Sequence, residues 1–513
     1  MGKSKSSPSD FLETSHLEGD LRKRSLQGGG FTAGAQISKF LLGLGFTYVL
    51  ARALTPEDFG IMGMVLVVTG FVARFKDLGL SMATVQRAAV DHDQVSTLFW
   101  LNVAIGAVLT LATAAMAPVV VWYYDEPRLM WITVVLSLAM LIGGLTAQHH
   151  ALLRRQMQFR ALAIIQIAAA ITAPTVAIIL ALLGAKYWAL VAMHLVAAAT
   201  IAIGSWVACG WRPGAPRRSS GVNSMINFGG NLAAASLFNH VSRNLDNFLI
   251  GGKLGATSLG MYTKAYQLLL LPIRQINAPV SGVAIPTLSR LQNDPRKYRG
   301  FYRRGVQLVT FIGLPIVAFT FVAAERVVMT MLGPQWTEAV LVFQVLAPAA
   351  MVTACNIATG WVYVSLAHTR RQLYWTIVES IATTLAFVIG LQWGIVGVAA
   401  GCSIAFCVLW LPGIIYCFKP TPVKLSDFFG SVWRGFCASL IAAGTLYAVS
   451  SSFVPGGASI PWLFVDAALY AVAYFGSWLL IPNGWATLNE LFSLLRSARS
   501  GPGSIDVVKD EGA

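Results

Sequence analysis

Long apolar runs separated by short polar segments dominate the chain from about Phe31 to Ile481. Each run is about 20 residues or longer, which is enough for a helix to cross a hydrocarbon core of ~30 Å. The alternation of apolar and polar residues that marks a membrane β-barrel does not appear. At ~32 residues per span and loop, the pattern predicts an all-α polytopic membrane protein with about fourteen transmembrane helices.

The eighth predicted helix stands out because of its length and its prolines. It would measure ~50 Å at 1.5 Å per residue, and it carries Pro272, Pro279 and Pro286. Two interpretations stay open, a kinked and gate-like helix or a rigid tilted one. The predicted helices are 31–53, 59–76, 95–122, 129–150, 161–183, 187–209, 222–252, 256–288, 302–324, 338–366, 373–391, 395–418, 430–453 and 460–481.

The composition agrees with a membrane protein. Hydrophobic residues make up 56% of the 513 positions and charged residues 12%, and the mean hydropathy is +0.65, far from the composition of a soluble domain. The net charge of +15 would suit a nucleic-acid-binding protein, but the basic residues alternate between loops instead of forming one patch. Most of them fall on the side of the N-terminus, so the positive-inside rule places both termini in the cytoplasm. We therefore expect no nucleic-acid partner.

An internal repeat is visible in two pairs of segments. "LTPEDFG" at 54–60 is similar to "LGATSLG" at 254–260, and "YWALVA" at 187–192 is similar to "QWGIVG" at 392–397. Two matches at nearly one offset predict two six-helix lobes related by a parallel repeat, plus two extra C-terminal helices. The predicted organisation is a cytoplasmic tail at 1–30, an N-lobe at 31–209, a cytoplasmic linker at 210–221, a C-lobe at 222–418, helices thirteen and fourteen at 419–481 and a cytoplasmic tail at 482–513.

Four basic residues lie inside the predicted spans. Lys39 is in the first helix, Arg243 in the seventh, and Lys264 and Arg274 in the eighth. An ionisable group costs ~2.5–3.5 kcal/mol in the hydrocarbon region, so it normally faces a partner or a watery cavity. Cations that line one cavity attract an anion. Because Lys and Arg are the standard partners of phosphate groups, we predict a phosphate or pyrophosphate ligand.

Structural interpretations of the same residues stay open. Arg243 could neutralise Asp246, which lies three residues further along the same helix face. Lys39 and Lys264 could extend their ammonium groups to the membrane interface. Arg274 could be cytoplasmic if the eighth helix projects from the membrane.

Other charged positions are weaker candidates. Arg52 and Arg74, at the ends of the first two helices, are assigned with Asp246 to a gate or ion pair, although the positive-inside rule explains Arg74 equally well. Glu379 and Asp466 are lone acids in late spans, for which proton coupling and a structural role are both open. Histidines and cysteines show no metal-ligand spacing, and no phosphate-binding loop of the ATPase type is present. We predict no metal and no cofactor.

Two blocks of sequence are specific and not merely hydrophobic. "LARALTPEDFGIMGMVLVVTGFVARFKDLGLSMATVQR" (50–87), continued by "QVSTLFWLN" (94–102), resembles the opening of the oligosaccharide flippase family. "NLDNFLIGGKLGATSLGMYTKAYQLLLLP" followed by "PTLSRLQNDPRKY" is similar to that family's seventh-to-eighth helix signature. The resemblance covers roughly residues 30–420. It is to the lipopolysaccharide- and colanic-acid-type polysaccharide exporters within the multidrug/oligosaccharidyl-lipid/polysaccharide flippase superfamily.

The resemblance implies two lobes around a cavity shared by the first, second, seventh and eighth helices. It implies a non-enzymatic transporter of the bacterial inner membrane that moves an undecaprenyl-pyrophosphate-linked oligosaccharide by alternating access, for exopolysaccharide or lipopolysaccharide biosynthesis. Its partners would be this substrate, membrane lipids, and polysaccharide polymerase and export machinery. By helix position, the pyrophosphate contacts carry over to Lys39, Arg243, Lys264 and Arg274, and Asp246 takes the family's seventh-helix Asp position.

Three alternatives remain. A cation-coupled multidrug antiporter of the same superfamily would be expected to gather acids in its cavity, which the sequence does not show. A membrane polysaccharide polymerase or glycosyltransferase would need a long outer loop to build its site, and the outer loops are short. A third possibility, a non-transporting scaffold for polysaccharide assembly, is left open by the sequence.

Overall fold

The computed structural model describes the backbone of residues 21–75, 81, 84–85, 90–216, 223–453 and 459–499. Side chains within these ranges are described except at residues 21–30, 32–33, 223–243, 278, 451–453, 491–492 and 494–499. The Arg243 side chain and parts of the predicted tails and linker therefore lie outside the described residues. The described ranges contain helices and no β-strand, which confirms the all-α class.

The chain divides into two compact units. Unit 1 consists of Met1–Lys264, Met331–Trp336 and Phe387–Val398, and unit 2 consists of Ala265–Thr330, Thr337–Ala386 and Ala399–Ala513. The predicted lobes at 31–209 and 222–418 follow the sequence repeat, and they stay a prediction.

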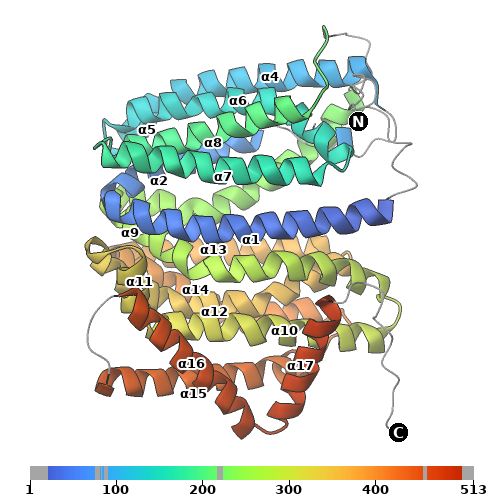
Figure 1. Ribbon diagram of the computed structural model, residues 1–513, viewed down its shortest axis with the longest axis vertical. Coiled ribbons are helices and arrows are strands. Elements are labelled where there is room, and N and C mark those ends of the chain that lie inside the picture. The colour runs from blue at the N-terminus through green and yellow to red at the C-terminus, as the bar shows by residue number, and fades with distance from the viewer. Residues whose placement is uncertain are drawn as a thin grey trace, which may run out of the picture. The chain divides into compact units, whose positions relative to one another are not determined.

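The helices of unit 1 pack lengthwise against one another. α4 lies along α6, α6 also contacts α8, and α7 contacts both α8 and α1 (Figure 1). The close crossing of α4 and α6 depends on Gly106 and Gly144, where an added Cβ would lie less than 3.0 Å from backbone oxygen of the other helix. The helices are α1 (Leu21–Ala53), α2 (Pro56–Val72), the short η3 (Ala73–Phe75), α4 (His92–Ala115), α5 (Ala117–Tyr124), α6 (Leu129–Arg155), α7 (Phe159–Leu182), α8 (Tyr187–Ala208) and the first part of α9 (Asn223–Arg290).

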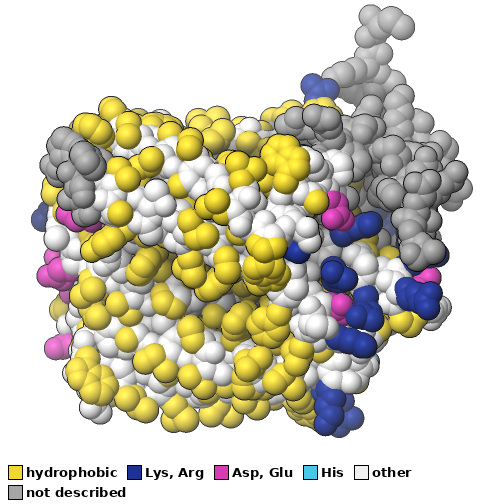
Figure 2. Space-filling view, turned by 90° about the horizontal axis from the view of Figure 1, so that it is seen from below, with side chains coloured by type: hydrophobic (Ala, Val, Ile, Leu, Met, Phe, Trp, Pro, Cys, Tyr) yellow, Lys and Arg dark blue, Asp and Glu magenta, His cyan; other side chains and the backbone are white. Residues whose placement is uncertain are grey.

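Unit 2 packs around α10, which contacts α12 and α15, and α15 contacts α16. Its core contains large buried aromatic side chains such as Tyr302, Trp361 and Phe428. On the face seen in Figure 2, hydrophobic side chains cover the broad middle and Lys and Arg gather at one end, as expected of a helical protein in a bilayer. Wholly or mainly in unit 2 are α10 (Pro295–Val322), α11 (Ala324–Met331), α12 (Thr337–Ser365), α13 (Thr369–Gly390), α14 (Gly394–Phe418), α15 (Leu425–Phe453), α16 (Ile460–Leu480) and α17 (Gly484–Arg499).

The predicted spans overlap these helices. Eleven helical stretches of the described chain are long and apolar enough to cross a membrane, and the bent α9 brings the number to twelve. One of the eleven, Thr369–Phe418, contains both α13 and α14. The count of fourteen crossings therefore stays a prediction. α1 begins at Leu21, inside the predicted tail, and the predicted third helix is divided at Met116 into α4 and α5.

The corner between α1 and α2 is built by local hydrogen bonds. Thr55 is the N-cap of α2: its hydroxyl accepts a 3.2 Å hydrogen bond from the Asp58 backbone N–H, and its own N–H donates at 3.0 Å to the Asp58 carboxylate. This reciprocal capping box satisfies two donors that a helix N-terminus leaves without intrahelical partners. Pro56 follows at the first helical position, where it lacks only a hydrogen bond that no residue could make there.

α9 folds back on itself at Gly255 and is a helical hairpin. Gly255 has φ 83° and ψ 179°, a conformation open essentially only to glycine. The Tyr262 hydroxyl donates a 3.0 Å hydrogen bond to the carboxylate of Asp246, 16 residues earlier, whereas the same residues would lie ~24 Å apart on a straight helix. The two limbs match the predicted seventh and eighth helices. A 42° bend separates Asn244–Asn277 from Pro279–Arg290, so the kinked interpretation of the eighth helix is correct.

Candidate functional site: basic residues of the predicted spans

Lys264 on the second limb of α9 is the best-defined candidate. Its Nζ atom lies 4.0 Å from the centroid of the Phe59 ring on α2, and His194 on α8 is within electrostatic range. Phe59 also packs against Trp336, with ring centroids 5.6 Å apart. Among the described residues, Lys264 forms no ion pair with a carboxylate. A cation–π contact contributes about 0.5–2 kcal/mol without cancelling the charge, and the anion-binding role of Lys264 stays a prediction.

Lys39 on α1 has a neutral partner as well. Its ammonium group donates a 2.8 Å hydrogen bond to Oε1 of Gln166 on α7. Gln166 is seven residues inside α7, ~10 Å from the helix end at 1.5 Å per residue, so Lys39 does not extend to the interface in this structure. Within the described part of the chain, Lys39 pairs with no carboxylate either.

Asp246 is buried, with 6% of its surface exposed. Its carboxylate accepts the hydrogen bond from Tyr262 and another of 2.7 Å from the Asn247 backbone N–H. These bonds stabilise a buried carboxylate and join the two limbs of α9. The predicted Arg243–Asp246 pair stays a prediction, because the Arg243 side chain lies outside the described residues. Sequence reasoning missed Tyr262, although Asp246 and Tyr262 are almost symmetric about the glycine-rich corner.

The three other arginines of the predicted site are exposed on the protein surface. Arg52 stacks on Tyr48, with 3.8 Å from its guanidinium carbon to the ring centroid, and donates a 3.3 Å hydrogen bond to the Met331 carbonyl. Arg74 is exposed in η3, and Arg274 is exposed on α9 in unit 2. Arg52 therefore ties the α1–α2 corner to the segment 331–336 of unit 1, while gate roles for Arg52 and Arg74 stay predictions.

The two candidate coupling acids lie in unit 2. Asp466 on α16 is 2% exposed, and it forms an ion pair with Arg326 on α11, whose side chain is 15% exposed. Glu379 is half-buried on α13. The Asp466–Arg326 pair favours the structural role over proton coupling, because both partners are engaged with each other.

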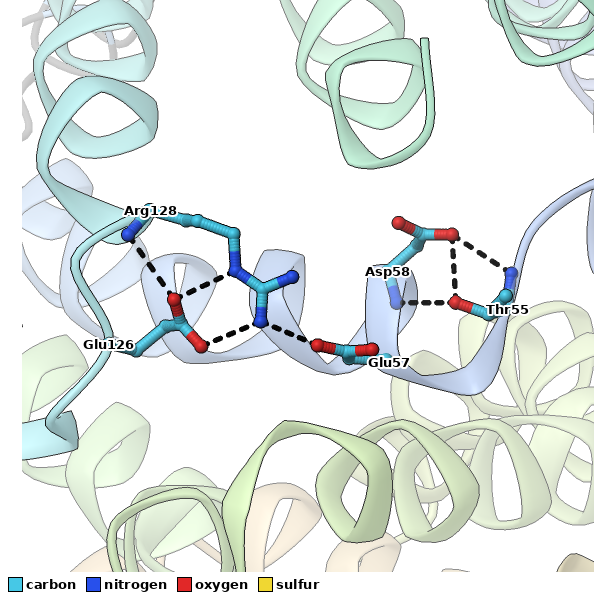
Figure 3. A network of polar contacts seen from close by, with 5 residues as sticks. All are labelled: Thr55, Glu57, Asp58, Glu126 and Arg128. Atoms are coloured by element: carbon cyan, nitrogen blue, oxygen red, sulfur yellow. Dashed lines mark hydrogen bonds and ion pairs between the residues drawn. The ribbon is translucent and has the colours of Figure 1, made fainter. Parts of the chain in front are cut away.

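A polar network, which sequence reasoning also missed, fixes the corner of unit 1 at the start of α2 (Figure 3). Arg128 donates hydrogen bonds to Glu126 at 2.7 Å and 2.8 Å and to Glu57 on α2 at 2.5 Å. The hydrogen bond from Arg128 lowers the pKa of Glu126, and these two carboxylates raise the pKa of Arg128. The loop between α5 and α6 is thereby held against the N-terminal turn of α2.

A cavity of 510 Å³ lies inside unit 2. α10, α12, α14 and α15 line it with apolar side chains such as Leu314, Met351, Trp410 and Phe436. Such a lining suits hydrocarbon and offers nothing to an anion. The predicted anion contacts Lys39 and Lys264 lie in unit 1, Arg274 lies in unit 2, and their convergence on one cavity stays a prediction.

The chain is similar to proteins of surface polysaccharide biosynthesis. Residues 49–341 match the family described as polysaccharide biosynthesis protein. Lipopolysaccharide biosynthesis protein WzxC of Escherichia coli (strain K12) is 24% identical over 455 residues, covering 88% of each chain. Succinoglycan biosynthesis transport protein ExoT of Rhizobium meliloti (strain 1021) is 25% identical over 345 residues, covering 67% of this chain and 69% of the relative.

Solved structures with the same fold are membrane transporters. Lipid II flippase MurJ in an inward closed conformation superposes with a TM-score of 0.69 at 13% identity, covering 87% of this chain and 97% of that one. An inward-facing multidrug transporter of the MATE family superposes with a TM-score of 0.58 at 14% identity, covering 75% and 98%. At these identities the likeness establishes the fold, and with the apolar helices it makes this chain a multi-pass membrane protein.

Proposed function

The chain belongs to the polysaccharide biosynthesis protein family, and from this premise we propose that it is a flippase for lipid-linked oligosaccharide. It moves an undecaprenyl-pyrophosphate-linked oligosaccharide from the cytoplasmic to the periplasmic leaflet of the bacterial inner membrane, for surface polysaccharide synthesis. The names of the relatives WzxC and ExoT support this class of substrate. The fold shared with MurJ, a lipid II flippase, is compatible with it.

The observation that carries the proposal is that two lysines of the predicted spans in unit 1 have neutral partners. Lys264 makes a cation–π contact with the Phe59 ring, and Lys39 donates a hydrogen bond to the Gln166 side-chain oxygen. A cation with a carboxylate partner would be neutralised before substrate arrived, whereas neither lysine pairs with a carboxylate among the described residues. In a low-dielectric setting such charges attract a pyrophosphate strongly, and each charged hydrogen bond to it contributes about 1.5–3 kcal/mol.

The transport cycle follows from this charge placement. The pyrophosphate of a lipid-linked glycan enters from the cytoplasmic leaflet and is held by Lys39 and Lys264, with Arg243 and Arg274 as further candidates. The protein then opens to the outside and releases the head group, while the polyprenyl tail remains in lipid. No bond is made or broken in this cycle, so the protein is a transporter and not an enzyme. Both termini remain in the cytoplasm.

A multidrug antiporter is the second candidate, and the described residues favour it less. An antiporter for organic cations would use carboxylates in its cavity. Asp246 is already engaged by Tyr262 and Asn247, and Asp466 by Arg326.

The direct test is translocation by the purified protein in lipid vesicles. A labelled lipid-linked oligosaccharide should move between leaflets with the wild type, and K39A, R243A and K264A should each move it more slowly. K419A provides a matched control, because Lys419 is an exposed lysine just after the end of α14 in unit 2, outside the predicted spans, and should not meet the substrate. Wild-type rates in all three cavity variants would contradict the proposal.

A further inference from the structure

The corner of α9 and the corner between α1 and α2 interlock through two glycines. A Cβ added to Gly60 would lie less than 3.0 Å from the carbonyl oxygen of Ala256, and one added to Gly260 would lie equally close to the carbonyl oxygen of Pro56. Both clashes are with backbone, which cannot rotate away as a side chain can. Backbone therefore touches backbone at both points, and only glycine permits it.

The two contacts are reciprocal. Gly60 and Gly260 are 200 positions apart, and so are Pro56 and Ala256. If the α1–α2 corner and the α9 corner are exchanged, the Gly60–Ala256 contact becomes the Gly260–Pro56 contact. An interface around a two-fold axis has this property. This reciprocity supports the parallel repeat at the level of atoms, at the corner where the "LTPEDFG" and "LGATSLG" segments meet.

Neighbouring contacts extend the interlock on both sides. Tyr123 stacks on Phe248 of α9 with ring centroids 4.3 Å apart. On the other side, the Trp336 indole N–H donates a 2.9 Å hydrogen bond to the Ala51 carbonyl. Both belong to unit 1, and both lie at the end of the helices that the positive-inside rule assigns to the outside.

The interlock is coupled to the membrane cation through sequence position. Phe59, whose ring faces Lys264, directly precedes Gly60, and Lys264 follows Gly260 by one helical turn. Separating the two corners would move the ring and the ammonium group apart. The cation–π contact therefore belongs to the interlocked state.

We propose that the Gly60–Gly260 interlock is the outer gate of the flippase, and that its closing sets Lys264 against the Phe59 ring. This inference rests on the proposed function. At Gly60 and Gly260 backbone meets backbone with no side chain between, so these two contacts can part and reform without a change of rotamer. In the closed state Phe59 is a positioning residue for Lys264, which it holds in place with its charge intact. Opening of the corners frees the ammonium group from the ring and gives the head group its exit.

The test is a series of glycine-to-alanine substitutions at the interlock, read out by the labelling rate of one introduced cysteine. M64C, in a variant with the six native cysteines replaced, places the reporter at a side chain that is 1% exposed and faces Gly251 of α9. The label is a membrane-impermeant maleimide added from outside. G60A and G260A should raise the labelling rate at least several-fold, because the added methyl group holds the corners apart.

Two further variants keep the test decisive. G63A would place its methyl group 3.2 Å from the Leu259 side chain, which can yield, so an intermediate labelling rate is expected. G45A has nothing within 4 Å of the added atom and should label like the parent. If G60A or G260A does not fold, the labelling rate of G63A compared with that of G45A still tests the gate. Equal labelling of G60A, G260A, G63A and G45A would overturn the gate. Graded labelling in a protein that moves no lipid-linked glycan would uphold the gate and reject the proposed function.

Discussion

Replacing Asp466 by Asn should destabilise unit 2 strongly, because it removes the counter-charge of a buried cation. The substitution keeps the shape of the side chain, so packing on α16 is preserved. Asp466 is 2% exposed and the Arg326 side chain 15%, which places the pair close to the fully buried case. Breaking a buried ion pair by neutralising one partner costs about 3–5 kcal/mol, and the slight exposure of Arg326 points to the lower end, about 3 kcal/mol.

The assay is thermal unfolding of the purified protein in detergent, followed by tryptophan fluorescence at a fixed scan rate. E490Q is the matched control, because Glu490 pairs with Arg304 in the same unit at 3.2 Å with about half of each side chain exposed. Such an exposed pair contributes about 0.2–1 kcal/mol. D466N should therefore lower the apparent Tm several times more than E490Q.

The double variant D466L/R326L distinguishes the cost of an unpaired buried charge from the contribution of the ion pair itself. It removes both charges, so it should recover most of the stability that D466N loses. A D466N protein with the Tm of E490Q would refute the structural role. If that protein also lost the pH dependence of transport, Asp466 would instead be the coupling acid.

Three further predictions concern unit 1. F59L should raise the apparent KM for the lipid-linked substrate several-fold, because Lys264 loses the ring that holds it in place. The effect on kcat should be smaller, and F59Y should restore the KM. Initial translocation rates at several substrate densities measure this. Because Arg128 lowers the pKa of Glu126, the ionised carboxylate stabilises the folded protein at a pH above the ordinary pKa of 4.5, and this stabilisation is lost as the pH falls below that value. The wild type should therefore have a higher Tm than E126Q at pH 6, and the difference should vanish in acid. G255A should lower stability by about 1–3 kcal/mol, because φ 83° and ψ 179° exclude a side chain, whereas G45A should not; equal Tm values would contradict the strained corner.

The sequence predicted the helices well because each helix is a continuous apolar run whose ends are marked by nearby capping, proline or glycine residues. The α1–α2 corner, for instance, is specified by Thr55, Pro56 and Asp58 within four residues. The corner of α9 was equally visible in "LGATSLG", and the resemblance between these corners pointed to a repeat. The family, too, was predicted from these two blocks.

Contacts between distant segments were not predictable in the same way. Nothing local indicates that Gly60 lies against Ala256 or that Arg326 reaches Asp466. Such pairs depend on how whole helices pack, and a single sequence carries no signal of which distant residues meet. The charges themselves were found, since a cation in an apolar run is conspicuous. Their partners are Phe59 for Lys264 and Gln166 for Lys39. These are uncharged residues on other helices, and nothing in their sequence neighbourhood points to a cation.

In the proposed function, Lys39 and Lys264, which pair with no carboxylate in the described part of the chain, hold the pyrophosphate of the substrate. Equilibrium binding of two lipids with the same polyprenyl tail, one carrying a pyrophosphate-linked sugar and one a neutral sugar, tests it most directly. The wild type should prefer the pyrophosphate lipid by at least about tenfold, since one charged hydrogen bond contributes about 1.5–3 kcal/mol, and K39Q/K264Q should lose that preference. An undiminished preference for the pyrophosphate lipid in K39Q/K264Q would contradict the account.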